Sequence, residues 1–218
     1  KKKYNSEKWS VTIKNSKGIS CFLSSDMSLY PHEIKAVIFD NDGTILDTVE
    51  LYFTIMESMV NSKFDEDFRI HLNGRSDMDI AQIVVDKFQL DMTWEEFLQK
   101  REPILTSKLP DCKYINGIEN IIRRFHEMKV PIAVATSSDR KPFEQKCSKK
   151  REIFDLFDAT VAGDEVTKAK PDPTVFLTAM KKLGNFKPEN VLVFEDAPNG
   201  ALAAQRAGMA CVLLDEHN

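Results

Sequence analysis

The chain has 218 residues, of which 42% are hydrophobic and 29% are charged, and its formal net charge is −4. This composition is typical of a soluble globular protein with one or two domains. The mildly acidic balance offers no electrostatic footprint for nucleic acid, and no apolar stretch approaches the roughly 18 residues that a membrane helix requires. We therefore expect neither nucleic acid nor a membrane as a partner.

The first 33 residues differ from the rest because they are rich in lysine and serine and show little sustained periodicity. We expect residues 1–33 to be a poorly ordered extension, in which the alternation at Trp9, Val11 and Ile13 favours one short edge strand. The four cysteines are widely spaced and form no C-x-x-C pair, which indicates reduced thiols in a cytoplasmic protein. A basic, serine-rich start is also compatible with part of a transit peptide, which would place the protein in an organelle.

Five short apolar runs have the length and composition of strands that are buried on both faces. They cover residues 34–39, 130–135, 159–162, 191–194 and 210–214. Helical patterns lie between them at 117–129, 141–150, 173–183 and 198–207, and the third should have Asp172 as its N-cap and Pro173 at its first position. This alternation predicts a doubly wound, Rossmann-like α/β core with a parallel sheet.

One interval, residues 48–112, breaks the alternation. It contains no strand-like run, and its apolar residues recur at helical spacing, as at Leu51, Ile55 and Met59. We therefore expect an inserted α-helical cap at 48–112 and a discontinuous core made of 34–47 and 113–218. Because the insert leaves the core after the first strand, it should cover the carboxyl ends of the strands, where open α/β sheets bind ligands, and act as a lid.

The first strand runs directly into Asp40-Asn41-Asp42-Gly43-Thr44. Residues two positions apart in an extended segment point to the same side, so Asp40 and Asp42 should converge, and Gly43 allows the chain to turn sharply. Two adjacent carboxylates need a counter-ion. The usual one for a small all-oxygen site is Mg²⁺.

Polar groups also follow the next three strands. They are the hydroxyls of Thr136-Ser137-Ser138, the lysine of Lys170-Pro171, and the acids Glu195-Asp196. Because parallel strands end at one edge of the sheet, hydroxyls, a lysine and acids should meet there with the paired aspartates. Phosphoryl transfer uses this set of groups, since its catalysis is mostly positioning and charge stabilisation.

Four segments resemble, in order, the four motifs of the haloacid dehalogenase (HAD) superfamily, namely 39–48, 135–138, 170–173 and 194–200. The resemblance spans residues 34–214. The helical insert is similar to that of the subgroup that holds small-metabolite phosphatases and β-phosphoglucomutase. Within this subgroup the segments 73–75, 81–84 and 154–157 are most similar to the pseudouridine-5'-phosphatase type, and related glycerol-phosphate phosphatases share much of the pattern.

The resemblance implies roles for individual residues. Asp40 would attack phosphorus and form an aspartyl-phosphate, while Asp42 would protonate the leaving alkoxide and then deprotonate the attacking water. Mg²⁺ would be held by the side chains of Asp40 and Asp196 and the backbone carbonyl of Asp42, with Glu195 in or next to that shell. The substrate's phosphoryl oxygens would be bound by Thr136, Ser137 and Lys170.

Three further positions bear on the reaction. Dehalogenases and phosphonate hydrolases of the superfamily lack an acid at the position of Asp42, and mutases carry a histidine where this chain has Tyr52, so the resemblance favours hydrolysis. Asn41 replaces the apolar residue that is usual in the family, and its side chain should point away from the site. Arg75, in a cap loop, is either a reader of the substrate's non-phosphate part or a surface charge.

The sequence therefore predicts a monomeric, Mg²⁺-dependent phosphomonoesterase that acts on a small phosphorylated metabolite. The first candidate substrate is pseudouridine 5'-phosphate or a related nucleoside monophosphate. The alternatives are a glycerol-phosphate or sugar-phosphate phosphatase, a mutase of the phosphoglucomutase type, and a HAD-fold binding protein without turnover.

Overall fold

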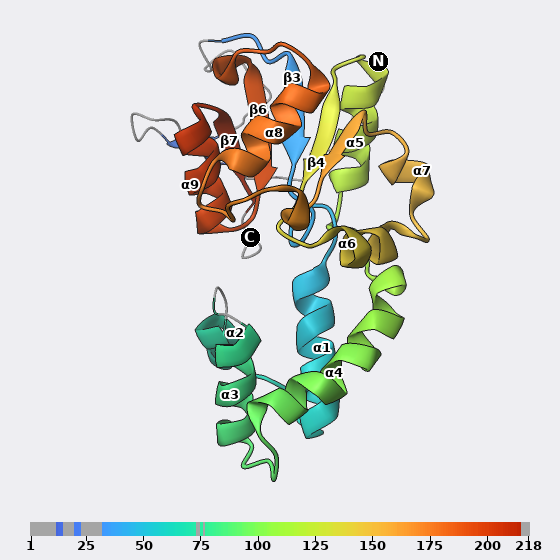
Figure 1. The fold of residues 1–218 in the computed structure, drawn as a ribbon, viewed down its shortest axis with the longest axis vertical. Coiled ribbons are helices and arrows are strands. Elements are labelled where there is room, and N and C mark those ends of the chain that lie inside the picture. Colours follow the sequence, from blue (N-terminus) through green and yellow to red (C-terminus); the bar gives the residue numbers. More distant parts are fainter. Residues whose placement is uncertain (1–11, 15–19, 23–31, 73–74, 76, 215–218) are drawn as a thin grey trace.

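The computed structural model describes residues 12–14, 20–22, 32–72, 75 and 77–214. A seven-stranded sheet lies at the centre of the main body, and helices flank it (Figure 1). A group of four helices projects from the end of the sheet at which the parallel strands finish (Figure 1). None of the described helices has both the length and the apolar character needed to cross a membrane.

Five parallel strands confirm the predicted doubly wound α/β core. They are β3 (Ala36–Phe39), β4 (Ile132–Ala135), β5 (Ala159–Val161), β6 (Val191–Glu195) and β7 (Ala210–Leu213), in the spatial order β7-β6-β3-β4-β5. The chain first builds outward from β3 to β5 and then returns to place β6 on the other side of β3. The order thus reverses between β3 and β6, and ligands of open α/β sheets bind in the crevice at such a point.

Two further strands extend the sheet beyond β7. The strand β1 (Thr12–Lys14) pairs antiparallel with β7, and β2 (Ser20–Phe22) pairs antiparallel with β1. Of the edge strand expected from the alternation at residues 9–13, Ile13 lies in β1, whereas Trp9 and Val11 lie outside the described residues. Among the described residues this part of the chain therefore forms two strands where the sequence suggested one. Because β1 is paired on both sides, the edge strand is β2 and not β1.

The core helices cover the two faces of the sheet. They are α5 (Ile118–Glu127), α6 (Arg140–Cys147), α7 (Arg151–Phe154), α8 (Thr174–Leu183) and α9 (Pro198–Ala207). Side chains of α5, α6 and α7 pack on one face of the sheet, and side chains of α8 and α9 pack on the other. The helix α8 starts one residue later than predicted, because the Asp172 carboxylate accepts its backbone hydrogen bond from Thr174 (3.0 Å) and leaves Pro173 at the N-cap.

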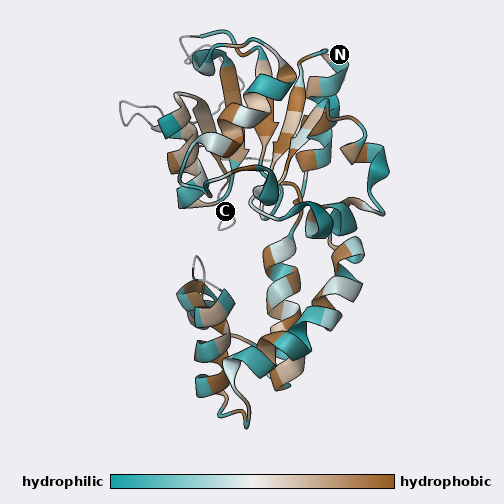
Figure 2. Ribbon diagram, in the orientation of Figure 1, coloured by the Kyte–Doolittle hydropathy of each residue, from teal (hydrophilic) through white to brown (hydrophobic). Residues whose placement is uncertain are grey.

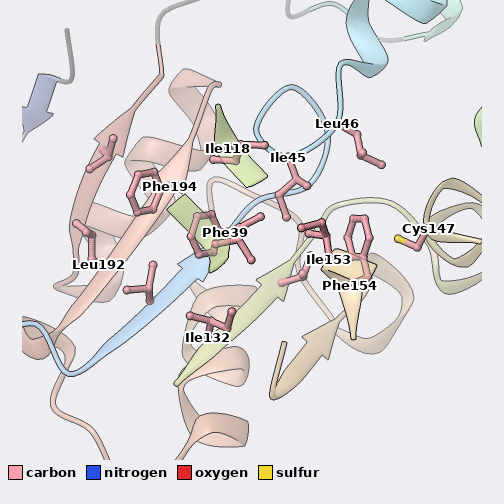
Figure 3. Packing of buried hydrophobic residues seen from close by; sticks show 14 of the residues in the cluster. Phe39, Ile45, Leu46, Ile118, Ile132, Cys147, Ile153, Phe154, Leu192 and Phe194 are labelled. Atoms are coloured by element: carbon pink, nitrogen blue, oxygen red, sulfur yellow. The ribbon is translucent and has the colours of Figure 1, made fainter. Parts of the chain in front are cut away.

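The strands read as continuous apolar runs because both of their faces are buried (Figure 2). On one face Phe39 stacks on Phe194 with ring centroids 4.7 Å apart, and Ile132 and Leu192 lie in the same cluster (Figure 3). On the other face Ile38 packs against α8 and α9 residues. This double packing fixes the ends of β3 and β6, from which the acidic residues emerge.

The inserted segment is helical, as predicted. Its helices, hereafter the cap helices, are α1 (Thr48–Val60), α2 (Glu66–Leu72), α3 (Asp77–Lys87) and α4 (Trp94–Lys108), followed by a 3₁₀ turn at Leu109–Asp111. They bury a cluster of their own, which includes Phe53, Phe68 and Phe97 and is separate from the clusters on the sheet. An independent core of this kind suits a cap that acts as one unit, although the division at 48 and 112 stays a prediction.

Candidate active site

The loop after β3 is held in a tight turn by its own backbone. The carbonyl of Asn41 accepts hydrogen bonds from the amides of Ile45 and Leu46, both at 2.9 Å, and the Gly43 amide donates to the Leu46 carbonyl at 2.8 Å. Gly43 has a positive φ of 82°, and a Cβ there would lie 2.1 Å from Oδ2 of Asp196. Glycine is therefore required both for the turn and for the close approach of the Asp196 carboxylate.

Three acids meet at the ends of β3 and β6. Carboxylate oxygens of Asp40, Glu195 and Asp196 lie within 4.8 Å of one another. Lys170, from the loop before α8, donates to Oδ1 of Asp40 at 2.5 Å and to Oε1 of Glu195 at 2.7 Å. One lysine against three acids leaves an excess of negative charge, and a buried excess of this kind needs a further cation.

Glu195 and Asp196 have different surroundings. Both oxygens of Glu195 are already engaged, because Oε1 accepts from Lys170 and Oε2 accepts from the backbone amides of Asp196 (2.9 Å) and Ala197 (2.8 Å). Asp196 accepts from the Thr44 hydroxyl at 3.1 Å and faces Gly43. This hydrogen bonding suits Glu195 to a place beside a metal shell rather than within it.

The electrostatics of Asp40 also indicate that the acidic cluster needs a further cation. Burial raises the pKa of the Asp40 carboxyl well above its ordinary value; Lys170 lowers it, and the charges of Glu195 and Asp196 raise it further. A dication beside Asp40 would favour the ionised form that a nucleophile needs. An all-oxygen donor set of carboxylates is what Mg²⁺ prefers, so the residues present fit that ion.

Asp42 lies in a different environment from Asp40. Its Oδ2 accepts hydrogen bonds from the hydroxyls of Thr136 (3.2 Å) and Ser138 (2.8 Å), and its Oδ1 forms an ion pair with Lys146. Burial raises the pKa of Asp42, but the charge of Lys146 and the hydrogen bonds from Lys146 and Ser138 outweigh it and lower the pKa. These contacts favour the ionised form of Asp42, which can accept a proton, so Asp42 must first take up a proton before it can act as an acid.

A cavity of about 630 Å³ lies between this loop and the cap helices. At its core end it is lined by Asp42, Ser137, Ser138 and Lys146. At its cap end the polar lining residues are Thr48, Tyr52, Arg75, Asp77 and Arg101, among apolar ones. The cavity therefore has one end rich in hydroxyl and charged groups and another with mixed polar and apolar character.

The structure brings most of the predicted residues together. Asp40, Lys170 and Asp196 lie in one cluster, and Thr136 contacts Asp42. Ser137 lines the cavity at its core end. Arg75 lies on the opposite wall, where its Nε donates to the His71 carbonyl at 2.7 Å.

Two buried cations next to the cavity were not predicted as site residues. Lys146 is one of several lysines in the helix predicted at 141–150, and Arg101 belongs to the interval predicted to form the helical cap. Both carry a signal in their spacing, because Arg101 lies four residues after buried Phe97 and Lys146 lies three after buried Phe143. A cation on an apolar helix face is unusual, since its burial requires a partner.

Comparisons with known proteins agree with this geometry. A family model described as haloacid dehalogenase-like hydrolase matches residues 37–214. The (DL)-glycerol-3-phosphatase 2 of Arabidopsis thaliana is 35% identical over 192 residues, which cover 84% of this chain and 80% of the relative. A probable pseudouridine-5'-phosphatase of Drosophila melanogaster is 34% identical over 187 residues, which cover 82% and 80%.

A solved structure shares the fold as well. The HAD hydrolase, family IA, variant 3, of Entamoeba histolytica has a TM-score of 0.65 and 27% identity, over 82% of each chain. The names of the Arabidopsis and Drosophila relatives refer to glycerol 3-phosphate and pseudouridine 5'-phosphate, two of the substrates that the sequence motifs left open. The match of the family model to most of the chain confirms the expected hydrolase, and the chain belongs to the haloacid dehalogenase-like hydrolase family.

Proposed function

We propose that the protein is a Mg²⁺-dependent phosphomonoesterase that hydrolyses a small phosphorylated metabolite through an aspartyl-phosphate on Asp40. The observation that carries this proposal is the different surroundings of the paired aspartates. Asp40 lies in a buried acidic cluster with Lys170, whereas Asp42 lines the cavity beside hydroxyls and a second lysine. That arrangement supplies a nucleophile and a separate proton carrier, as acyl-phosphate chemistry requires.

In the first half-reaction a carboxylate oxygen of Asp40 attacks phosphorus and the bond from phosphorus to the alcohol oxygen breaks. This step requires Asp42 to be protonated in the substrate complex; it donates that proton to the departing oxygen, so that the alcohol leaves neutral. Lys170, within 2.5 Å of Asp40, is placed to donate to the phosphoryl oxygens as their charge redistributes. Thr136 is the second donor in this scheme, since its hydroxyl lies beside Asp42.

In the second half-reaction Asp42, now ionised, takes a proton from a water molecule that attacks phosphorus. The bond between phosphorus and Asp40 breaks, phosphate leaves, and both aspartates return to their starting forms. Mg²⁺, held by Asp40, Asp196 and the backbone carbonyl of Asp42, would offset the repulsion between carboxylate and phosphate. Glu195 would hold Lys170 in place beside this shell.

The cavity supports a substrate larger than its phosphate. Its cap end combines apolar side chains such as Phe53 and Ile80 with the polar groups of Tyr52, Asp77 and Arg101. A nucleoside has both a flat apolar surface and hydrogen-bonding edges, so a nucleoside 5'-monophosphate such as pseudouridine 5'-phosphate is our first candidate. Glycerol phosphate is the second, because a glycerol-3-phosphatase shares 35% identity with this chain.

The proposal is tested by assaying hydrolysis of p-nitrophenyl phosphate with and without Mg²⁺. We expect turnover that requires Mg²⁺ and is lost in Asp40→Asn. No turnover by the wild-type protein, or turnover unchanged in Asp40→Asn, would contradict the catalytic proposal and leave a binding protein of the same fold.

A panel of pseudouridine 5'-phosphate, glycerol 3-phosphate and hexose phosphates then ranks the substrates. We expect the nucleotide to have the highest kcat/KM, and a preference for glycerol 3-phosphate would replace our first candidate by the second. We propose a monomer as the active unit. Size-exclusion chromatography at assay concentration tests this, and activity confined to a dimer would refute it.

A further inference from the structure

Lys146 is a buried lysine that the scheme above does not use. It belongs to the short helix α6, and only 2% of the residue is exposed to solvent. Burial of an ammonium group is unfavourable by several kcal/mol unless the group is paired and hydrogen-bonded. Among the described residues, the ion pair recorded for Lys146 is the one with Asp42.

Lys146, Ser138 and Asp42 form a closed ring of contacts. Nζ of Lys146 contacts Oδ1 of Asp42 and donates to the Ser138 hydroxyl oxygen at 2.8 Å. The Ser138 hydroxyl in turn donates to Oδ2 of Asp42 at 2.8 Å. Because both carboxylate oxygens are held from one segment, rotation of the Asp42 carboxylate is restricted.

The two buried lysines of the site contact different acids. Lys170 contacts Asp40 and Glu195, which belong to the nucleophile and metal cluster. Lys146 contacts Asp42 and lines the cavity with it. The position of helix α6 thus brings Lys146 next to Asp42, although the two residues are 104 positions apart in the sequence.

We propose that Lys146 is a positioning residue that, together with Ser138, holds the Asp42 carboxyl group at the cavity wall for proton transfer to the leaving oxygen. This inference rests on the proposed phosphatase function and adds a residue to it. Proton transfer needs its donor within hydrogen-bond reach of the leaving oxygen, so a carboxyl group that is free to rotate would protonate it less often.

The test uses two substrates that differ in their need for an acid. The p-nitrophenolate of p-nitrophenyl phosphate leaves without protonation, whereas the alkoxide of n-propyl phosphate does not. We expect Lys146→Met to lower kcat/KM for n-propyl phosphate at least tenfold more than for p-nitrophenyl phosphate. Ser138→Ala, which keeps the lysine, should also lower kcat/KM more for n-propyl phosphate than for p-nitrophenyl phosphate, but by a smaller factor. This variant replaces Lys146→Met in the test if Lys146→Met does not fold.

Two further variants separate positioning from packing. Lys150 is also buried, but it donates to the Pro110 carbonyl at 2.7 Å, so Lys150→Met is a matched control that should affect both substrates equally. In an Asp42→Asn background, Lys146→Met should cause little additional loss, because residues that act through one another are not additive.

The outcomes distinguish this inference from the function on which it rests. Equal losses for both substrates in Lys146→Met and Ser138→Ala, or full additivity with Asp42→Asn, would overturn the positioning role. Failure of the wild-type protein to hydrolyse either ester would instead overturn the proposed function.

Discussion

Replacing Gly43 by alanine should disturb the metal cluster more than the fold. The added Cβ would lie 2.1 Å from Oδ2 and 2.6 Å from Cγ of Asp196, so the carboxylate must move by about 1.3 Å to reach an ordinary contact of 3.4 Å. A displacement of about 1 Å at a catalytic group lowers the rate by about 100-fold, equivalent to about 2.7 kcal/mol. The φ of 82° adds about 1–2 kcal/mol of backbone strain.

The assay is a Mg²⁺ titration of p-nitrophenyl phosphate hydrolysis, with thermal unfolding as a second measurement. We expect Gly43→Ala to lower kcat/KM by about 100-fold and to require more Mg²⁺ for half-saturation. Gly208→Ala is the matched control, because its φ is 78° but its nearest neighbour would be Pro188 Cβ at 3.4 Å. It should lose similar stability and keep its activity. Wild-type activity and Mg²⁺ dependence in Gly43→Ala would refute the reasoning.

Three other predictions follow from buried or paired polar groups. Asn41 is fully buried, and neither of its amide atoms has a hydrogen-bond partner of normal geometry among the described residues. Asn41→Leu should therefore stabilise the protein by about 1 kcal/mol, measured as a higher Tm. Burial raises the pKa of Glu57, but hydrogen bonds from Lys63, Arg69 and a backbone amide lower this pKa to about 2. The stabilisation that Glu57 contributes is therefore fully present above its unfolded-state pKa of about 4.5 and is lost as the pH falls toward 2. Glu57→Gln should be less stable at pH 7 and should lose less stability on acidification, and parallel pH profiles for the two proteins would contradict this. Asp77 is half-exposed and accepts a 2.6 Å hydrogen bond from Arg101 at the cavity. Asp77→Ala should therefore raise the KM for the preferred metabolite about tenfold and leave the KM for p-nitrophenyl phosphate nearly unchanged. Equal changes in KM for both substrates would argue against a role of Asp77 in recognition.

The fold could be predicted because its signals are local. Each core strand is a short apolar run, and the polar residues after β3, β4 and β6 can be recognised from their residue types and their position at the ends of strands. Parallel strands bring those residues to one edge whatever the details of packing, so the convergence of Asp40, Lys170 and Asp196 followed from topology. The N-cap of α8 was displaced by one residue, because an Asp172 carboxylate can bond an amide two positions ahead as well as three.

The remaining features depend on contacts between distant parts of the chain. The pairing of Lys146 with Asp42 spans 104 positions, and that of Arg101 with Asp77 spans 24. The spacing of Lys146 from Phe143 places it on the apolar face of its helix, but a single sequence does not show which distant acid it pairs with. Similarly, the pairing of β1 with β7 joins residues about 200 positions apart, and no local signal specifies it.

The central claim is that Asp40 becomes phosphorylated, and chemical trapping tests it most directly. In Asp42→Asn, p-nitrophenyl phosphate should still transfer its phosphoryl group, but the water that cleaves the intermediate lacks its base, so phosphoenzyme accumulates. Borohydride reduces an aspartyl-phosphate to homoserine, which mass spectrometry locates in the peptide. We predict homoserine at position 40 only when substrate and Mg²⁺ are both present. Trapping at another residue, or release of phosphate with position 40 unmodified, would contradict the account.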